Sequence, residues 1–130
     1  MKHFTIIFII LIAFIACKTK KPASSKAIDE KVFNTWVHEG EKDSDSTRQY
    51  RPSNYELPPS RGRQGFTIEK NGNFILKDIA PACGLESFDG KWIQEQNGNI
   101  KVNFPKKVEK NFKFEIVRIE IDLLIIKIKN

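Results

Sequence analysis

The stretch Gly65-Phe-Thr-Ile-Glu-Lys-Asn-Gly-Asn-Phe-Ile-Leu76 decides the fold of this 130-residue chain, and Gly90–Phe104 repeats its pattern. In each stretch two runs of β-forming residues flank an Asn-Gly pair, which is typical of a β-hairpin. The turn can hold two or three residues, and this number sets which side chains face each other across the hairpin. The apolar residues decide between the two lengths.

A two-residue turn would place Phe66 opposite Lys77 and would mix apolar and charged side chains on one face. A three-residue turn, with its last glycine in the left-handed conformation, makes one face of both hairpins apolar. The pairs expected in this register are Phe66 with Leu76, Ile68 with Phe74, and Trp92 with Val102. We therefore predict a three-residue turn closed by a glycine bulge in both hairpins.

From Glu30 onward the chain lacks a sustained helical apolar period and instead shows short β-rich runs between turn signals, which predicts an all-β domain. The expected strands are Val32–His38, Gln49–Arg51, Gly65–Glu69, Asn73–Ile79, Gly90–Glu95, Asn99–Phe104, Phe112–Arg118 and Leu123–Lys129. We expect the last two to be antiparallel neighbours joined around Glu120–Asp122. Because Leu123–Ile126 is apolar throughout, the last strand is expected to be buried on both faces or bulged.

The N-terminus has the three-part layout of a secretory signal. Met1-Lys2 is basic, Phe4–Ala16 is almost continuously apolar, and Cys17 follows a small residue. The apolar run is too short to cross a bilayer as a lasting helix. Because it ends at a cysteine, the segment resembles a bacterial lipoprotein signal. An ordinary secreted protein, cleaved near Ala16, is the alternative.

The lipoprotein resemblance implies that residues 1–16 are removed and that Cys17 is acylated, with palmitate-type chains holding the protein on a membrane of the cell envelope. Residues 17–29 would then form a flexible tether to a domain of residues 30–130. The family's inner-membrane retention signal has aspartate at the position of Lys18. The lysine therefore favours the outer membrane, and the basic residues that follow favour its periplasmic face.

The net charge limits which molecules the protein is expected to bind, and the cysteine content limits which disulfides it can form. Residues 1–16 carry one of the 22 basic residues and none of the 16 acidic ones, so the mature chain has a net charge of +5. Three of these positive charges, Lys18, Lys20 and Lys21, lie at the start of the tether, where anionic headgroups attract them, and we expect no nucleic-acid partner. Cys83 would be left without an intramolecular disulfide partner. We expect a small, partly buried residue there, with a reactive thiol or an intermolecular bridge as the alternative.

The order of the strand motifs resembles that of lipocalin-like lipoproteins and secreted domains of bacteria. The matching residues are Thr35-Trp36, Gly65–Phe74, Gly90-Lys-Trp92, Phe114–Val117 and Leu123–Lys127. The resemblance implies a small antiparallel up-and-down barrel of about seven or eight strands, with a tryptophan near its base. Asn34 departs from the family pattern, which usually has glycine two residues before the tryptophan. A half-open sandwich of the same strands is the alternative fold.

The most distinctive stretch, from Arg48 to Phe66, contains four arginines and two tyrosines and is stiffened by proline. Its Tyr-Arg-Pro and following Tyr-Glu-Leu-Pro-Pro-Ser-Arg-Gly-Arg tracts also resemble uncharacterised lipocalin-like bacterial proteins. One interpretation is a rim at the barrel mouth that binds an anionic or sugar-like ligand. Its contacts would be Arg48, Tyr50, Arg51, Tyr55, Arg61 and Arg63. The other is a plug of one barrel end, in which the tyrosines pack and the arginines pair with Glu56, Glu69 or backbone carbonyls.

Metal-binding patterns are weak. Asp43 and Asp45 are spaced like the opening of a calcium loop, but Arg48 and Asn54 stand where that loop needs glycine and glutamate. We therefore expect residues 39–47 to be a solvated hairpin loop and predict no metal site and no cofactor.

Catalytic patterns are equally weak. His38 is the one histidine beyond the signal, at the end of a predicted strand, where we expect it to form a hydrogen bond. With a single histidine, a catalytic Ser-His or Cys-His pair could use only His38. A histidine-rich zinc site within one chain is excluded. Asp78, Glu86 and Asp89 show no spacing that requires a glycosidase-type pair. We expect a protein that is not an enzyme.

Two classes of function remain. The first is a lipid-anchored binding module that holds a small ligand or an envelope partner at the barrel rim. The second is a structural or interaction lipoprotein whose barrel is filled by its own side chains. Seven phenylalanines and two tryptophans beyond the signal provide enough bulk to fill a small barrel. We therefore expect a packed interior, with any ligand at the rim.

Overall fold

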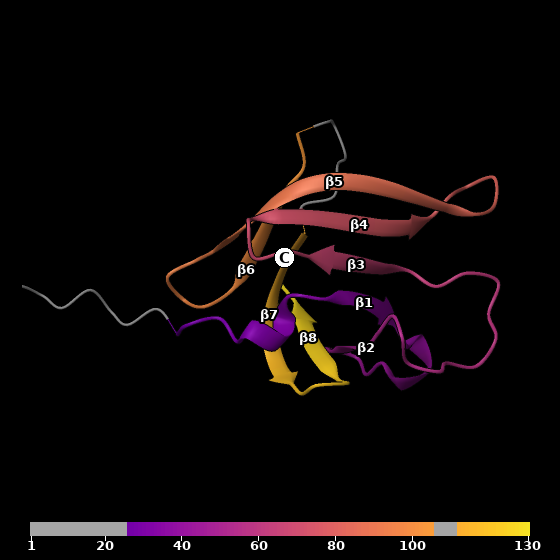
Figure 1. Ribbon diagram of the computed structural model, residues 1–130, viewed down its shortest axis with the longest axis horizontal. Helices are drawn as coiled ribbons and strands as arrows, with labels where there is room; N and C mark the ends of the chain where they lie inside the picture. The colour runs from indigo at the N-terminus through magenta and orange to yellow at the C-terminus, as the bar shows by residue number, and fades with distance from the viewer. Residues whose placement is uncertain (1–25, 106–111) are drawn as a thin grey trace, which may run out of the picture.

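Eight antiparallel strands form a closed barrel in the computed structural model, which describes residues 26–105 and 112–130 (Figure 1). The strands are β1 (Thr35–His38), β2 (Arg48–Pro52), β3 (Gly65–Ile68), β4 (Asn73–Ile79), β5 (Leu85–Gln94), β6 (Ile100–Asn103), β7 (Phe112–Ile119) and β8 (Leu124–Ile128). Two short 3-10 turns, η1 (Glu30–Val32) and η2 (Gly40–Lys42), flank β1. The predictions of an all-β domain and of a barrel with seven or eight strands are confirmed. The predicted signal and Cys17 lie outside the described residues.

One connection departs from the up-and-down order that we expected. Around the barrel the order is β1-β2-β8-β7-β6-β5-β4-β3, so β1 lies between β2 and β3. Both neighbours run antiparallel to β1. Residues 53–64 must therefore return along the length of β1 to reach the start of β3, and Figure 1 shows them passing around the end of β1. We call this segment the crossover. Extended chain covers about 3.3 Å per residue, so the segment is long enough to pass a four-residue strand.

Both Asn-Gly hairpins have the predicted register. Phe66 pairs with Leu76 and Ile68 with Phe74 in the first, and Trp92 pairs with Val102 in the second. The closing glycines have positive φ angles, 94° at Gly72 and 87° at Gly98, as the three-residue turn requires. The apolar face of each hairpin, and not the Asn-Gly dipeptide alone, sets the length of the turn.

Aromatic rings fill the barrel interior. The ring of Phe66 lies 5.1 Å from those of Tyr50 and Phe74, between ring centroids, and 5.7 Å from that of Phe114. Phe112 lies at the edge of this cluster, 5.3 Å from Phe114. Tilted and edge-to-face arrangements at these separations are favourable. The expected packed interior is therefore observed among the described residues.

The end of the barrel where the described chain begins is closed by η1. The indole nitrogen of Trp36 donates to the carbonyl oxygen of Val32 at 2.8 Å, and both side chains are fully buried. We predicted that the first strand begins at Val32. Because the chain forms this 3-10 turn, β1 begins at Thr35 instead. Ile28 packs against the core, and the carbonyl of Lys26 accepts a hydrogen bond from the Gln94 side chain at 2.7 Å.

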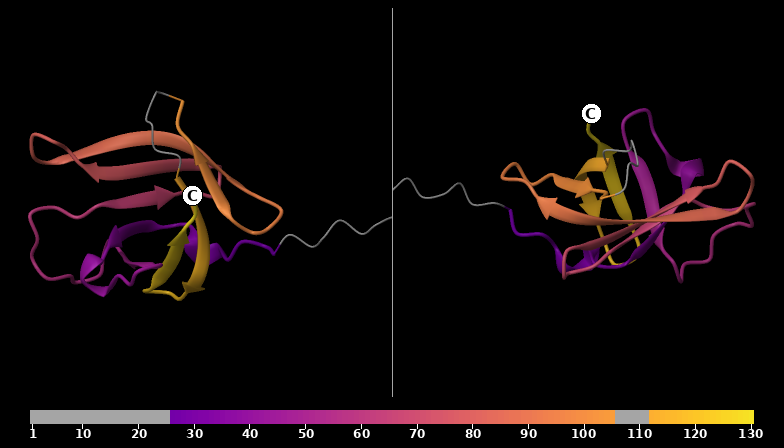
Figure 2. Two further views of the ribbon diagram at one scale, coloured as in Figure 1. Left: turned by 180° about the vertical axis from the view of Figure 1, so that it is seen from behind. Right: turned by 90° about the horizontal axis from the view of Figure 1, so that it is seen from above.

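The β4–β5 hairpin extends beyond the barrel, on the side opposite to residues 26–29 (Figure 2). β5 begins at Leu85, five residues before its predicted start. The first three residues of the strand are all exposed, so no buried apolar face marks this part of it in the sequence. Ile79 and Leu85 pair at the tip and are about half exposed. Cys83 is exposed there with φ 104°, so the expectation of a partly buried cysteine is wrong.

A bulge accommodates the apolar run of β8. The register between β7 and β8 shifts between Ile116 and Arg118, as an extra residue in one strand produces. Leu124 and Ile126 are fully buried, while Ile125 between them is partly exposed. The strand is thus buried mainly on one face, and the predicted irregularity lies in its partner. The two strands join through a turn in which the Glu120 amide donates to the Leu123 carbonyl.

Candidate ligand-binding site

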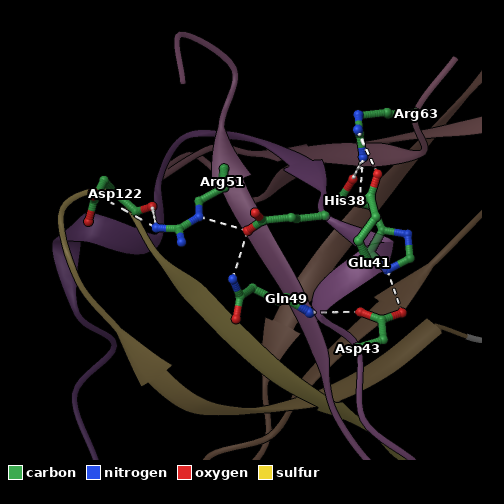
Figure 3. Close-up of polar contacts among 8 residues, drawn as sticks. His38, Glu41, Asp43, Gln49, Arg51, Arg63 and Asp122 are labelled. Carbon is green, nitrogen blue, oxygen red and sulfur yellow. Dashed lines mark hydrogen bonds and ion pairs between the residues drawn. The ribbon is translucent and has the colours of Figure 1, made fainter. Parts of the chain in front are cut away.

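Arg51 holds the start of the crossover against β1 and the β7–β8 turn. On β2 it points outward, and its Nε donates to the Glu39 carboxylate at 2.8 Å (Figure 3). Its Nη1 donates to the carbonyl oxygen of Asp122 at 3.0 Å, and its guanidinium lies 4.6 Å above the ring of Tyr55. Gln49 donates a further hydrogen bond to Glu39 at 2.7 Å. Nε and Nη1 of Arg51 and the Gln49 amide therefore donate to groups of the protein itself.

Arg63 holds the other end of the crossover. Its two terminal nitrogens donate to the two carboxylate oxygens of Glu41, both at 2.9 Å. The same nitrogens donate to the carbonyls of His38, at 3.3 Å, and of Pro58, at 2.9 Å. Only 13% of the Arg63 side chain is exposed. Arg63 therefore ties η2, the end of β1 and the crossover together.

The loop of residues 39–47 joins β1 to β2 and is exposed from residue 40 to 46, as the expected solvated hairpin loop requires, and its acidic side chains also bind the barrel. The Asp43 carboxylate accepts two hydrogen bonds, from Nε2 of His38 at 2.8 Å and from the backbone amide of Gln49 at 3.0 Å (Figure 3). The predicted hydrogen bond of His38 at the strand end is confirmed. Together with Glu39 and Glu41, Asp43 supplies acidic partners to residues of β1, β2 and the crossover.

The pKa values of the two glutamates reflect these contacts. Burial acts to raise the pKa of Glu39, but the hydrogen bonds from Arg51 and Gln49 outweigh it and the net shift is downward. The Arg63 guanidinium is the main cause that lowers the pKa of Glu41, to about 2. Both carboxylates are therefore ionised at neutral pH, and each forms an ion pair with an arginine of the distinctive stretch.

A hollow of about 300 Å³ opens at the barrel end opposite to η1. This end is where β2, β3 and β7 begin and where β4 finishes, so all four strands supply lining residues. The lining residues are Arg48, Tyr50, Gln64, Gly65, Leu76, Lys77, Asp78 and Phe112. We call this hollow the mouth. Its volume is at the lower end of the range for small-molecule pockets, about 300–1,000 Å³.

The floor of the mouth is aromatic. Phe112 contacts Phe114 on its core side and is itself only partly buried, so part of its ring faces the hollow. Tyr50 is 4% exposed and packs on Phe66, while its hydroxyl lies near the guanidinium of Arg48. Burial raises the pKa of Tyr50 to about 12, although Arg48 acts in the opposite direction. The phenol is therefore a neutral hydrogen-bond donor at neutral pH.

The edge of the mouth is polar and carries an arginine without an acidic partner. Within residues 26–105 and 112–130, no carboxylate forms an ion pair with Arg48. Gln64 donates its side-chain N–H to Asp78, and the Gln64 amide oxygen accepts no hydrogen bond from a described residue. Arg48 is exposed to solvent. The mouth thus combines a guanidinium fork, a phenol, an amide and an aromatic ring.

The six predicted ligand contacts divide between two places. Arg48 and Tyr50 line the mouth. The crossover contacts described above contain three others, Arg51, Tyr55 and Arg63. The two arginines form ion pairs with Glu39 and Glu41, and not with the predicted Glu56 and Glu69. Arg61 is exposed, and no described residue hydrogen-bonds to it.

Sequence reasoning missed Gln64, Leu76 and Phe112 at the mouth. The period of two residues along a strand could have found the last two. Leu76 shares a face with Phe74, and Phe112 shares a face with Phe114, so each lies on the inner side of its strand.

Other candidate groups give no further site. No group of three or more histidine, cysteine, aspartate or glutamate side chains suited to a metal ion occurs in the described part of the chain. In that same part, no helix has the length and apolar character needed to cross a bilayer. Cys83 lies at the β4–β5 tip and is not one of the residues that line the mouth.

Comparison with known proteins identifies no relative: no family model, no curated protein and no solved structure matches this chain.

Proposed function

We propose that this protein is a lipid-anchored binding protein of the cell envelope, whose small barrel holds a ligand at its mouth. The observation that carries the binding role is the mouth itself. Arg48, Tyr50 and Phe112 converge there on a hollow of about 300 Å³ above a packed core. A concave site with a few convergent polar groups over an apolar floor is the usual form of a small-molecule site. The proposal assigns no catalytic step to these residues.

The anchor rests on the N-terminal sequence, in which Phe4–Ala16 leads directly to Cys17. Acyl chains on this cysteine would attach the protein to the membrane, and Lys18 favours the outer membrane with the barrel in the periplasm. Replacing Cys17 by serine should abolish labelling by a fatty-acid analogue and should cause unprocessed precursor to accumulate. Continued labelling of Cys17→Ser would refute the anchor and would leave the mouth proposal standing.

Ligand binding is tested by thermal unfolding of the purified protein against a panel of envelope glycans, sugar acids, fatty acids and small anions. A ligand at 100 times its Kd stabilises the folded state by about 2.7 kcal/mol. The stabilisation should be absent in Phe112→Ala, compared with that variant's own unliganded midpoint. A ligand that stabilises Phe112→Ala as strongly as the wild type would bind elsewhere on the barrel and would contradict the proposed site.

The second candidate function is a structural or interaction protein without a ligand, and the aromatic filling of the barrel favours it. The exposed tip of the β4–β5 hairpin, with Ile79 and Leu85, would then be a natural contact for an envelope partner. Failure of the whole panel to shift the unfolding midpoint would favour this alternative.

A further inference from the structure

We propose that the ligand of the mouth is a sugar acid of monosaccharide size, held by its carboxylate on Arg48 and by its ring face on Phe112. This inference rests on the proposed function, because it names the chemical class that the same mouth would bind. The argument depends on the charge at Arg48, the free face of Phe112 and the polar groups between them.

The charge favours an acid over a neutral molecule. Arg48 is the first residue of β2, lines the mouth, and has no carboxylate partner among the described residues. The three other arginines with defined contacts, Arg51, Arg63 and Arg118, are each matched by a glutamate. A guanidinium binds a carboxylate through two parallel hydrogen bonds, which are stronger than those between neutral groups. Arg48 therefore supplies an anchoring point for a carboxylate.

The floor favours a ring with an apolar face. Phe112 packs against Phe66, Phe74 and Phe114, with centroid separations of 5.3 to 6.0 Å, so its orientation is fixed by the core. The part of the ring that these contacts do not cover lines the mouth together with Leu76. The C–H face of a pyranose ring can lie flat on such a surface, as any compact apolar face can.

The remaining polar groups favour hydroxyls over a purely apolar body. The Tyr50 hydroxyl is neutral, because burial raises its pKa, and it can donate to a ligand oxygen. The Gln64 amide oxygen can accept from a ligand hydroxyl. An alkyl or aryl carboxylate would cover both groups without pairing them, and unpaired polar groups weaken binding. A monosaccharide has roughly a dozen non-hydrogen atoms, a size suited to a pocket at the lower end of the usual volume range.

Three matched probes test the class by isothermal titration calorimetry on the purified protein in detergent. Glucuronate has the ring, the hydroxyls and the carboxylate; glucose lacks the carboxylate; cyclohexanecarboxylate lacks the hydroxyls. We expect glucuronate to bind at least about tenfold more tightly than either of the others, since one charged hydrogen-bonding contact is worth roughly that factor. Equal affinity for glucose would overturn the role of Arg48, and equal affinity for cyclohexanecarboxylate would overturn the role of the hydroxyls. Either result would leave a ligand-binding mouth in place.

Variants separate this inference from the proposed function. Arg48→Gln should reduce the preference for glucuronate over glucose to less than about threefold, while the exposed Arg61→Gln should leave it unchanged. Phe112→Leu should weaken glucuronate and glucose by similar factors. Unchanged affinities in both mouth variants would place the bound sugar elsewhere and would refute both proposals. If none of the three probes binds while another member of the ligand panel binds at the mouth, the sugar-acid class is wrong and the binding role remains.

Discussion

Removing the Arg63 side chain tests whether the crossover is fixed by its arginines. In Arg63→Ala, the carbonyls of His38 and Pro58 lose their charged donor, and the crossover loses its attachment to η2. A hydrogen bond to a charged group is worth about 1.5–3 kcal/mol, and the 3.3 Å bond to His38 counts at the lower end. The Glu41 side chain is more than half exposed, so water screens its ion pair with Arg63 and the pair adds little to the free energy of unfolding. With both bonds counted near the lower end, we expect a loss of about 3 kcal/mol in total.

Urea unfolding at pH 7, followed by the fluorescence of buried Trp36, measures this loss. With an m-value of about 1–3 kcal/mol/M, a loss of about 3 kcal/mol lowers the midpoint by roughly 1–3 M. Arg61→Ala is the matched control, because its side chain is exposed and should cost no more than about 0.5 kcal/mol. Arg63→Lys, which keeps the charge but loses the planar fork, should fall between the two. Equal midpoints for Arg63→Ala and Arg61→Ala would refute the structural role of Arg63.

Three further predictions follow from single positions. Gly65→Ala should prevent folding or destabilise the protein strongly, because the added methyl carbon would lie 2.3 Å from the Trp36 carbonyl oxygen of β1. In the control Gly40→Ala the methyl carbon meets only the His38 ring at 3.4 Å, so this variant should unfold near the wild-type temperature when followed by circular dichroism. The Arg63–Glu41 contact should contribute a small part of the stability, which is present above pH 4.5 and is lost as the pH falls towards 2, because hydrogen bonding to Arg63 lowers the pKa of Glu41. Glu41→Gln should make the acid loss in urea titrations slightly smaller, and a larger acid loss in this variant would contradict the assignment. Cys83 should react with a maleimide in the folded protein within a few-fold of its rate in denaturant, and strong protection would contradict its exposed position.

The strands and hairpin registers could be predicted because local apolar patterns determine them. The pairing of Phe66 with Leu76 requires only that one face of a hairpin be apolar, and both residues lie within one short stretch. The 3-10 turn before β1 could not be predicted in this way. In the sequence Val32 looks like part of a β-rich run, whereas in the structure the Asp29 cap and the hydrogen bond from the Trp36 indole to the Val32 carbonyl fix the turn.

The order of strands around the barrel could not be predicted from local patterns. An up-and-down barrel and the observed one use the same strands, and they differ only in whether β2 or β1 lies next to β3. The length of the crossover permits either arrangement. Gly65 allows β3 to approach β1 closely, because its α-carbon faces the Trp36 carbonyl and carries no side chain. A single glycine in the sequence does not show which strand will pack against it.

The arginines of the distinctive stretch show why its composition could not separate plug from binding site. Arg48 and Arg51 lie three residues apart on β2, so they point to opposite faces of the barrel wall. The outward Arg51 meets Glu39, which the β1–β2 connection places beside it. The inward Arg48 lies at the last position before solvent, beside aromatic rings. Asp78 lines the same hollow but accepts a hydrogen bond from Gln64, and no described carboxylate forms an ion pair with Arg48. The same residue type therefore stabilises the fold on one face and remains available to a ligand on the other, and the two-residue period of the strand decides which.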